Sequence, residues 1–192
     1  MTTIGPIAVA ASADDASEVA TTVSITANPL ANCDTVGVWN GWRFLGITIP
    51  AGSTINSAFI TLQFTSSTLD EPEVTISGLD VDGPGTFTTG VADISLRTRT
   101  TASVAWSNTN AGTSDVNTSN LSAIVAELLA SYTFSNSAMG FVWTTTSGTS
   151  TRDTSVRSYD NSTTLCARLT IDYTGPAALI PVYMNQYRQR TN

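Results

Sequence analysis

The sequence predicts an all-β domain, a jelly-roll-like antiparallel β-sandwich with one inserted amphipathic helix and with extended N- and C-terminal tails. Three observations predict it. Short segments with alternating apolar and polar residues recur along the chain, which is the period of half-buried strands. Turn-forming Pro, Gly, Asn and Asp residues separate these segments. A single segment has the apolar spacing of a helix instead.

The strands follow one another from Thr21 onward. Val23 and Ile25 alternate with polar residues before Asn28-Pro29 ends the first one. The strongest strand buries one face made of Ala58, Ile60, Leu62 and Phe64. The same reasoning predicts further strands over residues 43–49, 74–79, 104–106, 139–145, 155–159 and 165–173.

The helix is predicted where apolar residues recur at the i, i+3, i+4, i+7 and i+8 positions. These residues are Leu121, Ile124, Val125, Leu128 and Leu129, a spacing that indicates about three helical turns. Thr118 or Asn120 is expected to cap its start. We expect the helix to pack across one open end of the sandwich.

The chain is predicted to divide into an N-terminal arm over residues 1–19, the sandwich over residues 20–174, and a C-terminal docking tail over residues 175–192. The tail is apolar and then aromatic and basic. These residue types anchor interfaces, and a frayed terminus is the alternative. The predicted partner-docking residues are Tyr183, Met184, Tyr187, Arg188 and Arg190.

The net charge and the lack of His and Lys exclude several classes of function. The chain has a net charge of −7, with no His and no Lys. A negative surface repels phosphate backbones and anionic membranes, so we expect neither nucleic acid nor membrane as a partner. Without His and Lys there is no Ser-His-Asp triad, no His-based zinc site and no P-loop. The acidic cluster Asp70, Glu71 and Glu73 is more typical of solvated charge than of a glycosidase pair, so no catalytic residues are predicted.

Two sets of residues are candidates for ligand binding. Trp39 and Trp42 flank a turn-like Asn-Gly pair and are candidate glycan-binding residues, with core packing as the alternative. Asp80 and Asp82 precede Gly83 and are candidate calcium ligands, with an ordinary turn as the alternative. Trp106 and Trp143 are expected in the core.

Cys33 and Cys166 are far apart in the sequence. Two buried thiols are the favoured interpretation and a disulfide is the alternative.

Several motifs resemble one known family when they are taken in order. The run from Arg43 to Ile60, with its Ile-Pro-Ala-Gly-Ser-Thr-Ile centre, is similar to the opening of a phage and bacterial surface β-sandwich module. That module is related to DNRLRE-type and carbohydrate-binding-module-like jelly rolls. The similarity continues through residues 76–78, 94–100, 104–106, 121–129, 157–160 and 169–173. The resemblance implies a sandwich in an extracellular or particle-surface setting and no particular ligand. Residues 78–82 depart from the family pattern.

Three function classes follow. The first is a structural virion protein of a tailed phage: a capsid decoration, head-fibre or tail-accessory subunit at the virion surface. Its expected partners are other virion proteins, further copies of itself in a symmetric oligomer, and a host-surface glycan. We expect it to be made in the host cytoplasm without a signal peptide, because residues 1–6 lack a basic region. The alternative is a free-standing carbohydrate-binding module or adhesin, with calcium as a candidate cofactor. An enzyme is the third class.

Overall fold

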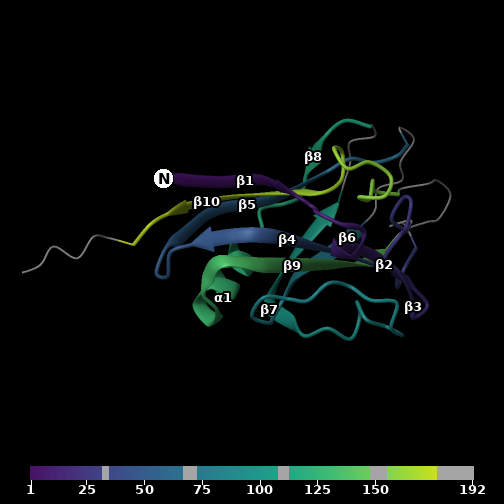
Figure 1. The fold of residues 1–192 in the computed structure, drawn as a ribbon, viewed down its shortest axis with the longest axis horizontal. Helices are drawn as coiled ribbons and strands as arrows, with labels where there is room; N and C mark the ends of the chain where they lie inside the picture. Colours follow the sequence, from purple (N-terminus) through teal and green to yellow (C-terminus); the bar gives the residue numbers. More distant parts are fainter. Residues whose placement is uncertain (32–34, 67–72, 108–112, 148–154, 177–192) are drawn as a thin grey trace, which may run out of the picture.

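A computed structural model describes residues 1–31, 35–66, 73–107, 113–147 and 155–176. These residues form two antiparallel sheets that face each other in two layers (Figure 1), which confirms the predicted all-β sandwich. The four-stranded sheet has, in spatial order, β1 (Thr2–Ala8), β10 (Arg168–Thr174), β5 (Thr54–Leu62) and β8 (Val116–Asn117). The six-stranded sheet has β3 (Thr22–Ser24), β2 (Asp15–Val19), β4 (Trp39–Ile49), β9 (Phe134–Ser147), β6 (Glu73–Leu79) and β7 (Arg99–Ser107).

The N-terminal residues differ from the prediction, because they belong to the sandwich and form no separate arm. β1 pairs with β10, and β2 pairs with β4 after a short 3-10 helix, η1 (Ser12–Asp14). The register of β1 shifts between Ile4 and Ile7, around Gly5 at φ +103°. This irregularity breaks the period-two pattern, so the strand is not visible in the sequence although Ile4 and Ile7 pack against the core.

The main core lies between the two sheets. Ala58, Ile60, Leu62 and Phe64 are fully buried, as their alternation predicts. They face an aromatic cluster from the six-stranded sheet, in which Trp42 meets the edge of Trp143 at 4.6 Å between ring centroids. Aromatic pairs of this geometry add stabilisation beyond the area that they bury.

A second core covers the outer face of the six-stranded sheet. Residues 80–98 connect β6 to β7 and lie over this face, burying Phe87 and Ile94 against Ala16 and Val142. Gly41 makes the close approach feasible, because a Cβ there would lie 2.5 Å from the Phe87 ring. The middle of the six-stranded sheet is therefore covered on both faces, whereas the outer face of β7 is exposed.

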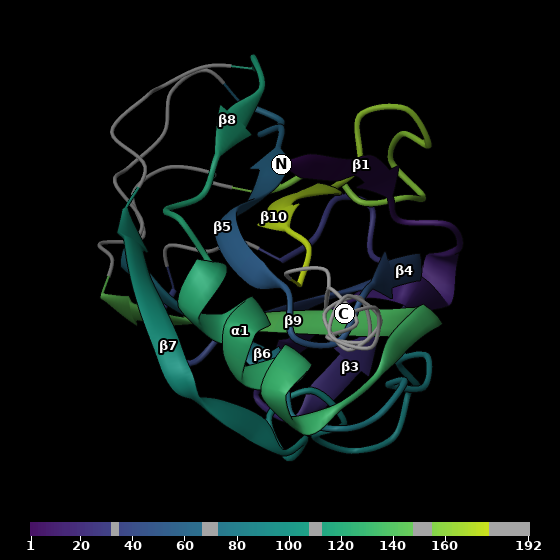
Figure 2. The same cartoon turned by 90° about the vertical axis from the view of Figure 1, so that its left-hand side faces the viewer.

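The predicted helix is present as α1 (Ser122–Ser131) and buries Ile124, Val125 and Leu128. Asn120 accepts hydrogen bonds through Oδ1 from the backbone N–H of Ser122 and of Ala58, so it ties the helix start to β5. Figure 2 looks onto the end of the sandwich that α1 covers. In the part of the chain that the structure describes, no helix is long and apolar enough to cross a membrane.

Candidate functional site

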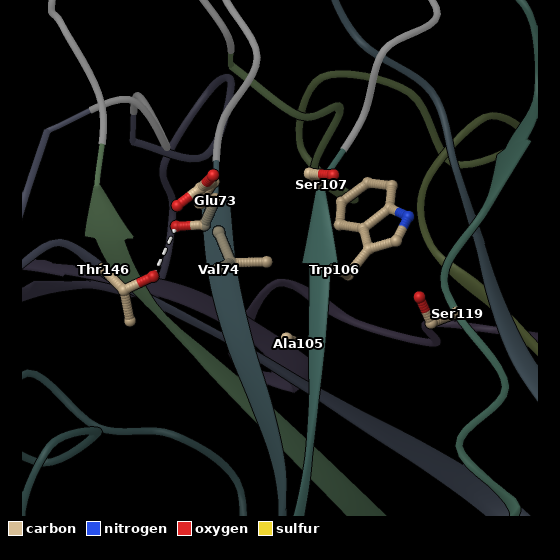
Figure 3. Close-up of a pocket in the computed structure, with 7 residues that line it drawn as sticks. All are labelled: Glu73, Val74, Ala105, Trp106, Ser107, Ser119 and Thr146. Carbon is tan, nitrogen blue, oxygen red and sulfur yellow. Dashed lines mark hydrogen bonds between the residues drawn. The ribbon is translucent and has the colours of Figure 1, made fainter.

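A pocket of about 360 Å³ opens at the end of the six-stranded sheet where β6 begins and where β7 and β9 end (Figure 3). It lies at the opposite end of the sandwich from Thr174, where β10 ends next to the first residues of β1 and β5. The lining residues come from the three strands and from the segment before α1: Glu73, Val74, Ala105, Trp106, Ser107, Ser119 and Thr146.

The rim of the pocket is polar. The hydroxyl of Thr146 donates to the backbone carbonyl oxygen of Glu73 at 3.1 Å, and the hydroxyl of Ser147 donates to the Glu73 carboxylate at 2.8 Å. Strand pairing fixes these groups, because Glu73 lies opposite Ser107 on one side and Ser147 on the other. The rim thus offers a carboxylate and several hydroxyl groups at fixed positions.

The aromatic wall of the pocket is Trp106, which is only 6% exposed. Its ring lies nearly parallel to that of Trp143 and to that of Phe64, with centroid distances of 5.7 and 6.3 Å. These contacts anchor the ring in the main core, so the wall is rigid but presents little aromatic surface to a ligand.

The two tryptophans predicted from the sequence do not form a common platform. Trp42 is fully buried in the main core, which leaves it no face for a glycan. Trp39 lies on the outer face of the same strand, where the guanidinium of Arg99 sits 4.8 Å from its ring centroid. A spacing of three residues places two side chains on opposite faces of a strand. The Asn-Gly pair between them suggested a turn and hid this strand.

Of the two candidate calcium ligands, one makes another contact in the structure and the other is exposed. Asp80 accepts a hydrogen bond from the hydroxyl of Tyr132 at 3.0 Å, which ties the start of the 80–98 connection to the end of α1. Asp82 is exposed, beside Gly83 at φ +57°. Among the described residues, no three His, Cys, Asp or Glu side chains gather closely enough to hold a metal ion.

The remaining sequence candidates are only partly described. Cys166 is a buried free thiol, and burial is the main cause that raises its pKa. Cys33 lies outside the described residues, as do the predicted docking residues Tyr183, Met184, Tyr187, Arg188 and Arg190.

The sequence analysis predicted neither the pocket nor the hydrogen bonds by which two glutamates, Glu18 and Glu127, hold backbone N–H groups of other segments. Glu18 accepts hydrogen bonds from the backbone N–H of Ile94 and Ser95, both at 2.9 Å. Glu127 accepts from the backbone N–H of Thr101 and Ala102 on β7, at 2.7 and 2.6 Å. The isolated position of Glu127 within an apolar helix is the one sequence signal that could have indicated such a contact.

Comparisons with known proteins add no relative. No protein-family model matches the chain, and the search of curated proteins gave no match either.

Proposed function

We propose that this chain is a structural virion protein of a tailed phage, a capsid-decoration, head-fibre or tail-accessory subunit. In this proposal the C-terminal residues 177–192 attach it to the particle, and the sandwich is presented on the surface. The resemblance of residues 43–60 and the later motifs to a phage and bacterial surface module supports the setting. The coverage of the middle of the six-stranded sheet on both faces suits a building unit.

The observation that carries the proposal is that the two ends of the sandwich differ. Strand β10 ends at Thr174, beside the start of β1, and the described chain continues from there to Pro176. Strand β9 runs to the other end of the sandwich (Figure 1), and the pocket with its polar rim lies where β9 ends. A partner that holds the residues after Pro176 would therefore leave the pocket end free to face outward.

The charge distribution supports attachment through the same residues. Residues 1–176 contain six of the eight arginines and all fifteen acidic residues, a net charge of −9. Residues 177–192 contain Arg188 and Arg190 and no acidic residue. Sandwiches of like charge repel one another, whereas the basic tail is attracted to an acidic neighbour. This asymmetry favours contacts with other virion proteins or with further copies of the chain through the tail.

Removal of the tail tests the proposal. Full-length protein is expected to sediment with purified particles, and a chain ending at Pro176 is expected to stay in the supernatant. A full-length variant with Tyr183→Ala and Tyr187→Ala should lose most of its occupancy, and Thr191→Ala is the matched control that should keep it. Circular dichroism should show that the shortened chain keeps its β structure. Unchanged occupancy of the shortened chain would contradict the docking role.

Glycan binding is a second candidate function, and the pocket is the observation that favours it. Sugar hydroxyls bind to carboxylate and hydroxyl groups of the kind that Glu73, Ser119 and Thr146 present there. Glu73→Gln and Thr146→Val should weaken binding on a glycan array by about tenfold, the loss expected for one hydrogen bond of about 1.4 kcal/mol. Asp172→Asn, on β10 of the other sheet, should leave it unchanged. If the protein binds no glycan on the array, glycan binding is excluded as its function.

A further inference from the structure

Asp15 is a fully buried carboxylate at the start of β2. Its Oδ2 accepts a hydrogen bond from the backbone N–H of Tyr159 at 2.7 Å. In the antiparallel ladder Asp15 lies directly opposite Trp42 of β4, so the two side chains project from the same face of the sheet. That face belongs to the main core, where Trp42 is fully buried.

The charged groups near Asp15 share its sign. Asp14 precedes it in η1 and Asp160 lies on the segment that carries Tyr159, while the Cys166 thiol is a further neighbour. Arg43 makes an ion pair with Asp14 at 2.6 Å, but it follows Trp42 in β4 and so projects from the other face of the sheet. Glu18 also faces that other side, where it bonds to Ile94 and Ser95.

These surroundings disfavour the ionised form of Asp15. Burial raises its pKa, the hydrogen bond from Tyr159 lowers it, and the carboxylates of Asp160 and Asp14 raise it again, to about 7. The ordinary pKa of an aspartate is 3.8. Asp15 therefore changes its charge near neutral pH, whereas a solvated carboxylate does so in acid.

The partner of Asp15 is the middle of a segment whose ends are fixed independently. The backbone N–H of Leu30 donates to the carbonyl of Val156, and the N–H of Val9 donates to the carbonyl of Ala167. Between these ties, Ser12 and Asn28 bond to Asp160 at exposed positions. The contact of Tyr159 with Asp15 ties the middle of the segment to a buried side chain, and the Cys166 thiol near its end makes a second buried contact, with the carbonyl of Val9.

We propose that Asp15 and Tyr159 form a proton-controlled clamp, which holds the middle of segment 156–167 on the N-terminal strands while the Asp15 carboxyl group is protonated and loosens it when that group ionises. The hydrogen bond from Tyr159 favours the ionised carboxylate, but burial in the closed arrangement disfavours it more, so ionisation favours opening. Opening transfers the carboxyl group to water, where it ionises readily. From about pH 4 to about pH 7, the opening constant therefore rises about tenfold for each pH unit, up to about a thousandfold, and then levels off. The clamp is independent of the proposed function.

Nuclear magnetic resonance of the intact chain tests the clamp directly. The carboxyl carbon of Asp15 is expected to titrate near pH 7. The protection of the Tyr159 amide against hydrogen exchange, corrected for intrinsic exchange, should fall about tenfold per pH unit between pH 5 and pH 7. Titration of Asp15 below pH 5, or equal protection at pH 5 and pH 8, would overturn the proposal.

Substitutions isolate the residue responsible. Asp15→Asn keeps the shape and the acceptor oxygen but cannot ionise, so Tyr159 protection should become independent of pH. Asp172→Asn is the matched control, because Asp172 bonds to Thr3 and Ser57 at exposed or partly buried positions and should leave the wild-type pH dependence intact. An Asp15→Asn chain that keeps the full pH dependence would refute the clamp. If this variant does not fold, the wild-type measurements still decide the question.

Discussion

Single carboxylates connect distant parts of this low-charge chain. Glu18 is buried on β2 and accepts from two backbone N–H groups and the hydroxyl of Ser95, more than 70 residues away. Asp93 lies within the same 80–98 connection and accepts hydrogen bonds from Arg97 and from the Thr88 backbone. Partial burial raises the pKa of Asp93, but these hydrogen bonds lower it, so that its pKa lies below the usual value. At this scale the acidic residues act as structural acceptors.

Removal of the Glu18 charge should weaken the 80–98 connection. Glu18→Gln keeps the size of the side chain but replaces a carboxylate that accepts three hydrogen bonds with an amide that cannot match all of them. We expect a loss of about 2–4 kcal/mol in the free energy of unfolding, measured in urea. Glu73→Gln, at an exposed position, should change it by less than about 0.5 kcal/mol. Equal effects of the two substitutions would show that Glu18 is not a structural acceptor.

At the scale of elements, regular periodicity decided what the sequence could predict. β5 and α1 were predicted because each packs one face against the core, which imposes alternation on Ala58 to Phe64 and helical spacing on Leu121 to Leu129. β1 was missed because of its register shift at Gly5. The first half of β4 was missed because the Asn-Gly pair between Trp39 and Trp42 suggested a turn, and because both faces of the strand are covered, so its residues do not alternate between apolar and polar.

The candidate site could not be predicted from the sequence, for a different reason. Its lining residues come from four separate stretches of the chain, and each stretch contributes one to three residues with no distinctive spacing. Only the pairing of β6 with β7 and β9 brings them together. Sequence reasoning did assign Trp106 to the core, and the ring stacking places it there while one edge lines the pocket.

The 80–98 connection depends on the absence of a side chain at Gly41. Gly41→Ala would push a methyl group into the Phe87 ring, which a hydrogen bond from Phe87 N to the Ala13 carbonyl holds in place. We expect a loss of about 1–3 kcal/mol in unfolding free energy by thermal or urea denaturation. Gly85→Ala is the matched control, because a Cβ at Gly85 meets no atom within 4 Å. A neutral Gly41→Ala substitution would mean that Phe87 does not pack on the sheet as described.

At the scale of the whole molecule, the two cores make the middle of the six-stranded sheet an inner layer between the four-stranded sheet and the 80–98 connection. The two ends of this body differ. One end holds α1 and the start of β1 together with the end of β10 (Figures 1 and 2). The other end holds the pocket. The difference between the two ends, together with the net negative charge of residues 1–176 and the net positive charge of residues 177–192, leads to the proposal of a surface subunit attached at one end.

A density map of the native particle is the most direct test of that proposal. We expect sandwich density on the outer surface, with the α1 end toward the particle, the pocket end outward, and residues 177–192 in contact with a neighbouring protein. A map that shows the pocket end buried against the shell, or particles that lack this chain altogether, would contradict it.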